Sequence, residues 1–360
     1  MNKIDQVVAS IDIAKYWKVF VFSMLAVFLM VILPHLINKI IQPQQVMSPL
    51  PAPDVMKNVE DKLLIKPKNS FQLQKKSSFL KTAYAETSND YQNLKAYVTV
   101  DLDSGEILEQ KALSDKLPIA SLTKIMTAVV ALDLAKPEEL FEVSGKAANQ
   151  IPTKIGMLPG EKMTLDELLN GALLTSANDA VDVIKEGVNK KYGGDIFVKA
   201  MNEKAKLIGL KNSRFTNPQG FDIADNYSSV EDLAILSHYA LANYPLIADI
   251  VKKDYQFLAA NENHGQHDLY NWNGLIGVYP GASGIKIGNT DDAGYTTAVL
   301  SERSNKKILA VLLGAPGVLE RDLWASELLD AGFIKDANLD PVNLTKADLK
   351  QKYSTWKYFN

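Results

Sequence analysis

Strand-like segments at both ends of the central region constrain the fold of this chain more than any other feature. Residues 96–102 alternate in character, and the turn Asp103-Ser104-Gly105 separates them from a second short strand at residues 106–110. Late in the chain, residues 295–301 and 307–314 read as two more strands around a turn at residues 302–305. These segments predict one sheet assembled from both ends of the region.

The residues between these strands have helical spacing. A capping-box pattern, Thr164-Leu165-Asp166-Glu167, opens one of the helices. The predicted helices cover residues 121–135, 164–174, 177–190, 195–208, 229–242 and 319–331, the last ending at Gly332. We therefore expect an α/β (α+β) fold, in which helices pack on an antiparallel sheet and also form an α-rich subdomain.

The N-terminal region contains a segment long and apolar enough to cross a membrane. Residues 17–41 include an uncharged run at residues 19–33, and lysines are more frequent before this run than after it. This bias predicts a cytoplasmic N-terminus at residues 1–16, a single-pass anchor at residues 17–41, and the rest of the chain outside the cytoplasm. A cleavable signal peptide is the competing interpretation, but no small-x-small site directly follows the run. A buried core helix is a third.

The composition changes after the anchor. Residues 42–92 hold five prolines and lose hydrophobic periodicity, which indicates a linker with a root-mean-square reach of about 40 Å. Residues 93–334 would form the folded domain, and the polar residues 335–360 a tail. The absence of cysteine excludes disulfides and a cysteine nucleophile, and a net charge of −3 without a basic run gives no indication of nucleic-acid binding.

Ser121 and Lys124 stand three residues apart at the start of a predicted helix, so their side chains lie on one face. A serine hydroxyl needs a base to become a nucleophile, and a lysine amine can be that base if burial lowers its pKa. The flanking residues make the helix apolar enough to be buried. The same spacing also occurs on solvated helix faces, so the pair alone leaves both interpretations open.

Two further segments carry groups that suit such a site. Ser176 and Asn178 lie on a turn between predicted helices, where they could relay a proton and hold a peptide carbonyl, or cap a helix. Lys286 lies on a predicted strand flanked by glycines, which would allow a ligand to approach closely. A hairpin with a surface lysine is the alternative interpretation of that strand.

In this order, Ser-x-x-Lys, Ser-x-Asn and Lys-x-Gly resemble the motif set of the penicillin-recognising serine enzymes. More narrowly, the chain is similar to the low-molecular-mass D-alanyl-D-alanine carboxypeptidases over residues 93–333. The similar segments are residues 97–101, 118–128, 173–180, 215–220 and 227–229. The resemblance implies a β-lactamase/transpeptidase-like fold. It also implies hydrolysis of the terminal D-Ala-D-Ala bond of peptidoglycan stem peptides, through an acyl-enzyme and without a cofactor or metal.

Carried over by position, the resemblance makes Ser121 the nucleophile and Lys124 its general base. Ser176 would pass a proton to the leaving amine, and Asn178 would hold Lys124 and the substrate amide. The backbone N–H groups of Ser121 and Asn289 would form the oxyanion hole.

Ile287 departs from the family pattern Lys-Thr-Gly, because this chain has Lys286-Ile287-Gly288. Lys286 would still attract the terminal carboxylate of the substrate, but the threonine hydroxyl that would bind it is missing. A hydrogen bond to a charged group is worth roughly 10- to 150-fold in affinity. We therefore expect weakened or altered specificity, with Thr290 as a substitute hydroxyl.

Other classes of function fit less well. A serine β-lactamase would need its deacylating glutamate after Ser-x-Asn, whereas Glu167 and Asn170 precede it. The chain lacks the Gly-x-Ser-x-Gly motif expected of a Ser-His-Asp hydrolase, and His238 falls in an apolar helix. His264 and His267 suggest a solvated loop rather than metal ligands. The main alternative is a non-catalytic peptidoglycan-binding or scaffold protein, whereas an active enzyme should be covalently inhibited by β-lactams.

Overall fold

The computed structural model describes residues 17, 21–25, 28, 30, 55–63, 71–75 and 90–356. The chain divides into two compact units, Met1–Pro53 and Asp54–Asn360. Residues 1–16 and most of the predicted anchor at 17–41 lie outside the described residues. Within the described part, no helix has the length and apolar character needed to span a bilayer. All the predicted site residues lie in the second unit.

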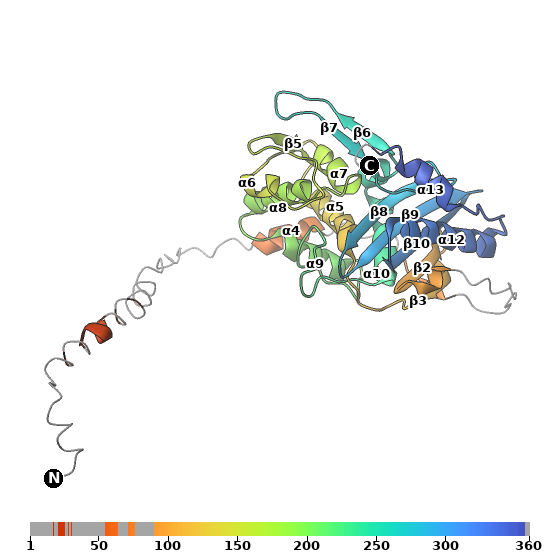
Figure 1. The fold of residues 1–360 in the computed structure, drawn as a ribbon, viewed down its shortest axis with the longest axis horizontal. Helices are drawn as coiled ribbons and strands as arrows, with labels where there is room; N and C mark the ends of the chain where they lie inside the picture. The colour runs from red at the N-terminus through yellow and green to blue at the C-terminus, as the bar shows by residue number, and fades with distance from the viewer. Residues whose placement is uncertain are drawn as a thin grey trace, which may run out of the picture. The chain divides into compact units, whose positions relative to one another are not determined.

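The second unit contains a sheet whose strands come from both of its ends (Figure 1). Six described strands lie in the order β1-β3-β2-β10-β9-β8, and all neighbours are antiparallel except β1 and β3. Their bounds are Gln74–Lys75 (β1), Ala96–Asp101 (β2), Glu106–Lys111 (β3), Ala282–Thr290 (β8), Gly294–Arg303 (β9) and Lys306–Ala315 (β10). Since β2 pairs with β10, the two predicted hairpins join, and the predicted antiparallel sheet is confirmed.

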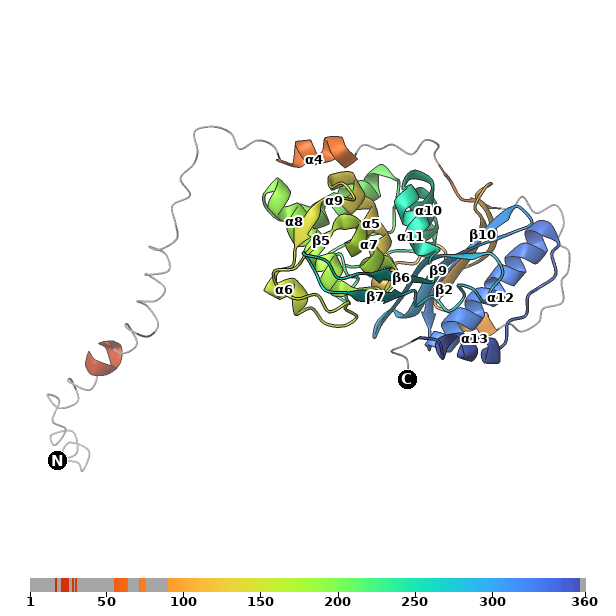
Figure 2. The ribbon, with the colours of Figure 1, turned by 90° about the horizontal axis from the view of Figure 1, so that it is seen from above.

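Helices cover both faces of this sheet (Figure 2). On β10, Leu309, Val311 and Leu313 belong to one hydrophobic cluster, while Ile308 and Leu312 belong to another. The first cluster includes α10 (Val230–Asn243) and the second includes α12 (Val318–Ala337). Because β10 is buried on both faces, its sequence is an almost continuous apolar run rather than a strict alternation.

Five of the six predicted helices begin and end within two residues of their expected bounds. The capping box of α7 is present, since Thr164 Oγ1 accepts from the Glu167 N–H and the Glu167 carboxylate accepts from the Thr164 N–H. The remaining elements are η2 (Asp90–Asn93), η3 (Ala120–Leu122), α5 (Thr123–Leu134), β4 (Leu140–Glu142), α6 (Gly145–Ala148), β5 (Lys162–Thr164), α7 (Leu165–Leu173), α8 (Asn178–Tyr192), α9 (Phe197–Leu207), α11 (Pro245–Val251), β6 (Tyr255–Leu258) and β7 (His267–Tyr270).

The closing helix α12 continues past Gly332, where the sequence predicted its end, and that prediction is wrong. A Cβ at Gly332 would lie 2.7 Å from side-chain atoms of both Thr99 and Ile308. The glycine therefore lets the C-terminal part of α12 pack closely on the sheet. The helix ends instead at Asn338, which has the left-handed backbone conformation typical of a C-terminal cap.

The predicted tail at residues 335–360 is in part folded. After α12, the chain forms α13 (Lys346–Tyr353), which begins with a capping box formed by Thr345 and Asp348. Leu349, Tyr353 and Trp356 are buried in the same cluster as α12. Because the apolar spacing of this short helix is weak, the sequence did not indicate that it contributes to the core.

The predicted linker at residues 42–92 also differs from the structure. Residues 55–63 form α4 (Val55–Leu63), whose Val59 and Leu63 are fully buried in the large core cluster. The Leu63 carbonyl accepts a hydrogen bond of 2.9 Å from Lys204, which is itself buried and forms an ion pair with Asp133 at 2.9 Å. Further on, the Phe71 ring stacks on His238 at 3.8 Å. This part of the linker is therefore docked on the domain.

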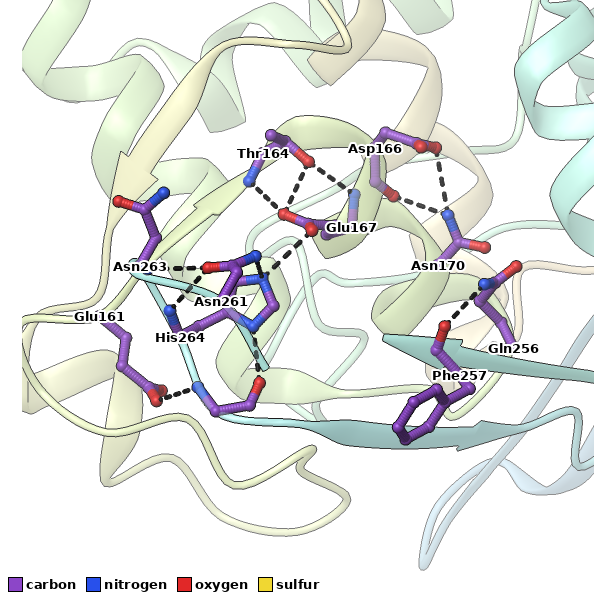
Figure 3. A network of polar contacts seen from close by, with 11 residues as sticks. Glu161, Thr164, Asp166, Glu167, Asn170, Gln256, Phe257, Asn261, Asn263 and His264 are labelled. Atoms are coloured by element: carbon purple, nitrogen blue, oxygen red, sulfur yellow. Dashed lines mark hydrogen bonds and ion pairs between the residues drawn. The ribbon is translucent and has the colours of Figure 1, made fainter. Parts of the chain in front are cut away.

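The loop between β6 and β7 packs on the start of α7 through polar contacts (Figure 3). His264 contacts the Glu167 carboxylate at 3.1 Å and donates from Nδ1 to the Gly265 carbonyl. Glu161 accepts from the Gly265 N–H. Residues 259–262 and 265–266 are exposed, as predicted for a solvated loop, whereas the side chains of His264 and His267 are buried. Among the described residues, no group of three or more histidine or acidic side chains could hold a metal ion.

Candidate active site

Ser121 and Lys124 meet at the junction of η3 and α5, as their spacing predicted. Lys124 is fully buried, and its Nζ lies 2.8 Å from Ser121 Oγ, 2.9 Å from Asn178 Oδ1 and 2.8 Å from the Gln219 carbonyl oxygen. The Asn178 amide is oriented by its Nδ2, which donates to two backbone carbonyls. A neutral amine can therefore donate its two N–H groups to Asn178 and Gln219, which leaves its lone pair facing the Ser121 hydroxyl.

The electrostatic environment favours that neutral amine. Burial lowers the pKa of Lys124 to about 7, and the negative charge of Asp179 opposes this shift. The Asp179 carboxylate accepts hydrogen bonds from the N–H groups of Ile155 and Gly156. Near neutral pH, about half of the Lys124 side chains can thus accept a proton from Ser121.

Ser176 and Asn178 lie on the turn that leads into α8, and both are buried. Ser176 has a positive φ of 62°, and its carbonyl accepts a hydrogen bond from the Thr153 hydroxyl. The capping interpretation of this turn is wrong, because the N-cap residue is Ala177 and no side chain caps the helix. The turn instead directs Asn178 to Lys124, at the centre of the site.

Gln219 is a site residue for which the sequence predicted no role. Its backbone carbonyl binds Lys124, and its side chain donates to the buried Asp182 at 2.9 Å. Gly220 follows with a φ of 93°, and a Cβ there would lie 1.9 Å from the Ala120 carbonyl oxygen. The glycine is therefore required for this loop to approach η3. The segment 215–220 was among those that resemble the family, and this was the signal available in the sequence.

Strand β8 forms the other side of the site. A Cβ at Gly288 would lie 2.7 Å from the Ser121 backbone nitrogen, so β8 and η3 touch at this glycine. Asn289 is exposed and pairs with Tyr295 of β9. The backbone of Ser121 thus lies next to the strand that carries Asn289, as the predicted oxyanion hole requires.

Lys286 is buried on β8 rather than exposed, so the surface-hairpin interpretation is wrong. Its Nζ donates to the Ile287 carbonyl at 2.9 Å. Burial, together with the positive charges of Lys124 and Arg321, holds the pKa of Lys286 well below its ordinary value. An anionic group of a ligand placed beside Lys286 would favour its charged form and oppose this lowering of its pKa.

Ile287 is 7% exposed and belongs to neither hydrophobic cluster. No hydroxyl replaces the threonine of the family pattern at this position. Thr290, the predicted substitute, donates its hydroxyl to Asp222 at 2.7 Å. An acidic partner makes Thr290 poorly suited to bind a carboxylate.

Arg321, whose positive charge acts on Lys286, is held by residues of the two C-terminal helices. Arg321 of α12 pairs with Asp322 at 2.7 Å and donates to the Trp272 carbonyl. Tyr353 of α13 donates to Asp322 at 2.8 Å, and Trp356 stacks on Trp272. Helix α13 is therefore connected, through Asp322, to Arg321, and the positive charge of Arg321 acts on Lys286.

Comparisons with known proteins agree with these observations. Residues 83–317 match the peptidase S11 family model, described as D-alanyl-D-alanine carboxypeptidase. The chain is 34% identical to the D-alanyl-D-alanine carboxypeptidase DacF of Bacillus subtilis over 78% of this chain and 73% of that protein. It is 30% identical to DacB2 of Mycobacterium tuberculosis, over 66% of this chain and 82% of that protein.

Solved structures share the fold. Penicillin-binding protein D2 of Listeria monocytogenes, in an ampicillin-bound form, is 26% identical with a TM-score of 0.56 and covers 67% of this chain and 97% of its own. The DD-transpeptidase of Streptomyces K15 is 24% identical with a TM-score of 0.62 and has the same coverage. With the family match spanning well over half of its residues, the chain belongs to the D-alanyl-D-alanine carboxypeptidase family, peptidase S11.

Proposed function

We propose that this protein is a serine-type D-Ala-D-Ala carboxypeptidase that trims peptidoglycan stem peptides through an acyl-enzyme on Ser121. One observation carries the proposal: a fully buried lysine with a pKa lowered to about 7 lies 2.8 Å from the hydroxyl of Ser121. The family match and the named relatives support the same reaction. No step of this reaction needs a cofactor.

In the first step, Ser121 Oγ attacks the carbonyl carbon between the two D-alanines, and its proton moves to Lys124 Nζ. The backbone N–H groups of Ser121 and Asn289 stabilise the negative oxygen of the tetrahedral intermediate. The C–N bond then breaks, and the proton that Lys124 took from Ser121 passes through the Ser176 hydroxyl to the amine of the departing D-alanine, which leaves Lys124 neutral and Ser176 protonated as before. Water hydrolyses the remaining ester, with Lys124 again accepting a proton, and Ser121 is released.

Lys286 attracts the carboxylate of the terminal D-alanine. Burial and the nearby Lys124 and Arg321 lower the pKa of Lys286, and a bound carboxylate would counter this by stabilising the protonated amine. Isoleucine at position 287 keeps the backbone of β8 but supplies no hydroxyl, so the carboxylate is bound less tightly than by a threonine.

Covalent labelling tests the proposal. The purified domain should gain the mass of one penicillin on Ser121 and release D-alanine from a stem pentapeptide, and Ser121→Ala should do neither. The Listeria relative with ampicillin bound is consistent with binding of a β-lactam by this chain. If wild-type protein forms no adduct and releases no D-alanine, the non-catalytic peptidoglycan-binding function is the correct one.

We also propose that residues 17–41 anchor the protein in the cell membrane and that the catalytic domain lies outside the cytoplasm. The uncharged run at residues 19–33 and the excess of lysines before it support this arrangement. Carbonate extraction should leave the full chain in the membrane fraction, and a protease added outside intact spheroplasts should digest the domain. Release by carbonate would contradict the anchor.

A further inference from the structure

Asp182 of α8 is a buried carboxylate close to the active site. It lies one helical turn after Asn178 and is 1% exposed. Each of its oxygens accepts a hydrogen bond from a different glutamine: Oδ1 from Gln219 Nε2 at 2.9 Å, and Oδ2 from Gln150 Nε2 at 2.6 Å. A carboxylate is costly to bury, and Asp182 takes no part in the proton transfers at Ser121. Its partners therefore indicate its role.

The first partner, Gln219, belongs to the loop that contacts the general base. Its backbone carbonyl oxygen lies 2.8 Å from Lys124 Nζ, while its side chain extends to Asp182. The same residue thus carries both the acceptor for Lys124 and the amide that is held by Asp182. Oδ1 of Asp182 therefore fixes the position of one acceptor of the base.

The second partner, Gln150, connects Asp182 to the other acceptor of Lys124. It directly precedes residues 151–152, whose carbonyls each accept a hydrogen bond of 3.1 Å from Asn178 Nδ2. These bonds orient the Asn178 amide, whose Oδ1 lies 2.9 Å from Lys124 Nζ. Each oxygen of Asp182 therefore holds one of the two loops on which an acceptor of Lys124 depends.

Two lysines face the same carboxylate at longer range. Lys146 Nζ of α6 lies 4.0 Å from Asp182 Oδ2, and Lys185 Nζ lies 3.9 Å from Oδ1. Both distances are too long for a hydrogen bond, and the Lys146 side chain is largely exposed, so water screens its charge. The directional partners of Asp182 are therefore the two glutamine amides, and an ion pair does not explain its burial.

We propose that Asp182 is a positioning residue of the active site: it holds both loops in place so that the lone pair of Lys124 faces Ser121. The neutral amine has two N–H groups, and both point to acceptors that these loops hold. A shift of either loop would turn the lone pair away from the serine hydroxyl. The inference rests on the proposed function, because it concerns the activation of Ser121 by its base.

Substitutions in the full-length chain test this role through penicillin acylation at alkaline pH, where Lys124 is neutral. Asp182→Ala releases both loops and should slow acylation of the folded protein about 10- to 100-fold. Gln150→Ala and Gln219→Ala each release one loop without removing a charge, and each should slow acylation about five- to twentyfold. The control Glu186→Ala removes a charge one turn further along α8, outside the two loops, and should leave the rate unchanged.

A conservative variant separates the hydrogen bonds of Asp182 from its charge. Asp182→Asn keeps the shape of the side chain, and its amide can bind both glutamines once one of them turns its oxygen inward. It should therefore acylate within about threefold of the wild-type rate. If Asp182→Asn is as slow as Asp182→Ala, the charge and not the positioning of the loops matters, and the inference is wrong.

The kinetics also distinguish positioning from a purely structural role. Because Asp182 does not touch the ligand, Asp182→Ala should lower kcat for D-alanine release and change KM by less than about twofold. Adding Gln219→Ala to Asp182→Ala should slow acylation by less than about twofold more, since the two side chains act through one hydrogen bond. Fold-losses that multiply would overturn the inference.

Urea unfolding of each variant completes the test. Variants that lose stability but acylate at the wild-type rate would show that Asp182 only stabilises the fold, which would overturn the positioning role and leave the carboxypeptidase intact. A wild-type protein that forms no penicillin adduct and releases no D-alanine would overturn the proposed function itself.

Discussion

The lowered pKa of Lys124 leads to a sharp expectation for the pH dependence of acylation. Burial places this pKa at about 7, whereas an exposed lysine titrates near 10.4. Only the neutral amine can take the proton of Ser121, so the rate should rise with pH and level off above the pKa. With a pKa of about 7, the neutral fraction is about 9% at pH 6 and about 91% at pH 8, which predicts a roughly tenfold rise.

The assay is the second-order rate of acylation by a neutral-side-chain penicillin between pH 5.5 and 9.5, followed by intact mass. Circular dichroism at each pH should confirm that the protein stays folded. The control Lys162→Ala removes an exposed lysine and should keep the midpoint near 7. Asp179→Asn should move the midpoint lower, because the Asp179 charge favours the protonated lysine.

A rate that still increases tenfold for each pH unit between 8 and 9.5 would refute this reasoning, since it would indicate a base with an ordinary lysine pKa. A flat profile would remove Lys124 from the proton transfer altogether. Lys124→Arg should lower acylation by about 100- to 10,000-fold at every pH, because a guanidinium cannot act as a base.

Three substitutions test other parts of the site. Ile287→Thr should raise kcat/KM for D-alanine release by about tenfold or more, because the added hydroxyl can bind the substrate carboxylate, and no change would mean that the carboxylate lies elsewhere. Gly288→Ala should slow acylation about 100- to 1,000-fold in a folded protein, because the new Cβ would displace the Ser121 backbone N–H, and near-wild-type acylation would exclude that contact. Tyr353→Phe should lower the free energy of unfolding in urea by about 1.5–3 kcal/mol, since it removes a donor from the buried Asp322 carboxylate, and an unchanged midpoint would show that α13 contributes little there.

The local parts of the fold could be predicted from the sequence because their signals are local. The capping box at Thr164 fixes the start of α7 within a few residues, and the turn at residues 103–105 lies between strands that pair with each other. Gly332 was misread because its meaning depends on Thr99 and Ile308, which are distant in sequence. A glycine that ends a helix and one that lets a helix approach a sheet look the same in the sequence.

The site shows the same division between local and distant information. Ser121 and Lys124 could be paired from their spacing alone, since three residues span one helical turn. The Gln219 contact could not be predicted, because the group that binds Lys124 is a backbone carbonyl, which every residue has. The polar character of residues 261–267 predicted a solvated loop, and most of these residues are exposed, but His264 and His267 are buried. The His264 ring contacts Glu167 of α7, and His267 Nδ1 donates to the Ile155 carbonyl, and neither contact could be predicted from the loop's own sequence.

The charges around Ser121 are arranged in a way that keeps its base, Lys124, neutral. Arg321 is paired with the Asp322 carboxylate, whereas the contacts of Lys124 are with neutral oxygens of Ser121, Asn178 and Gln219. A carboxylate of the protein at hydrogen-bond distance from Lys124 would keep it protonated, and it could not then accept the serine proton. Asp179 acts on Lys124 only from beyond hydrogen-bond distance, and the carboxylate that makes direct contact in the site is that of the substrate, at Lys286. Because that carboxylate belongs to the departing D-alanine, it leaves before deacylation, and the surroundings of Lys124 again favour the neutral base when water attacks the ester.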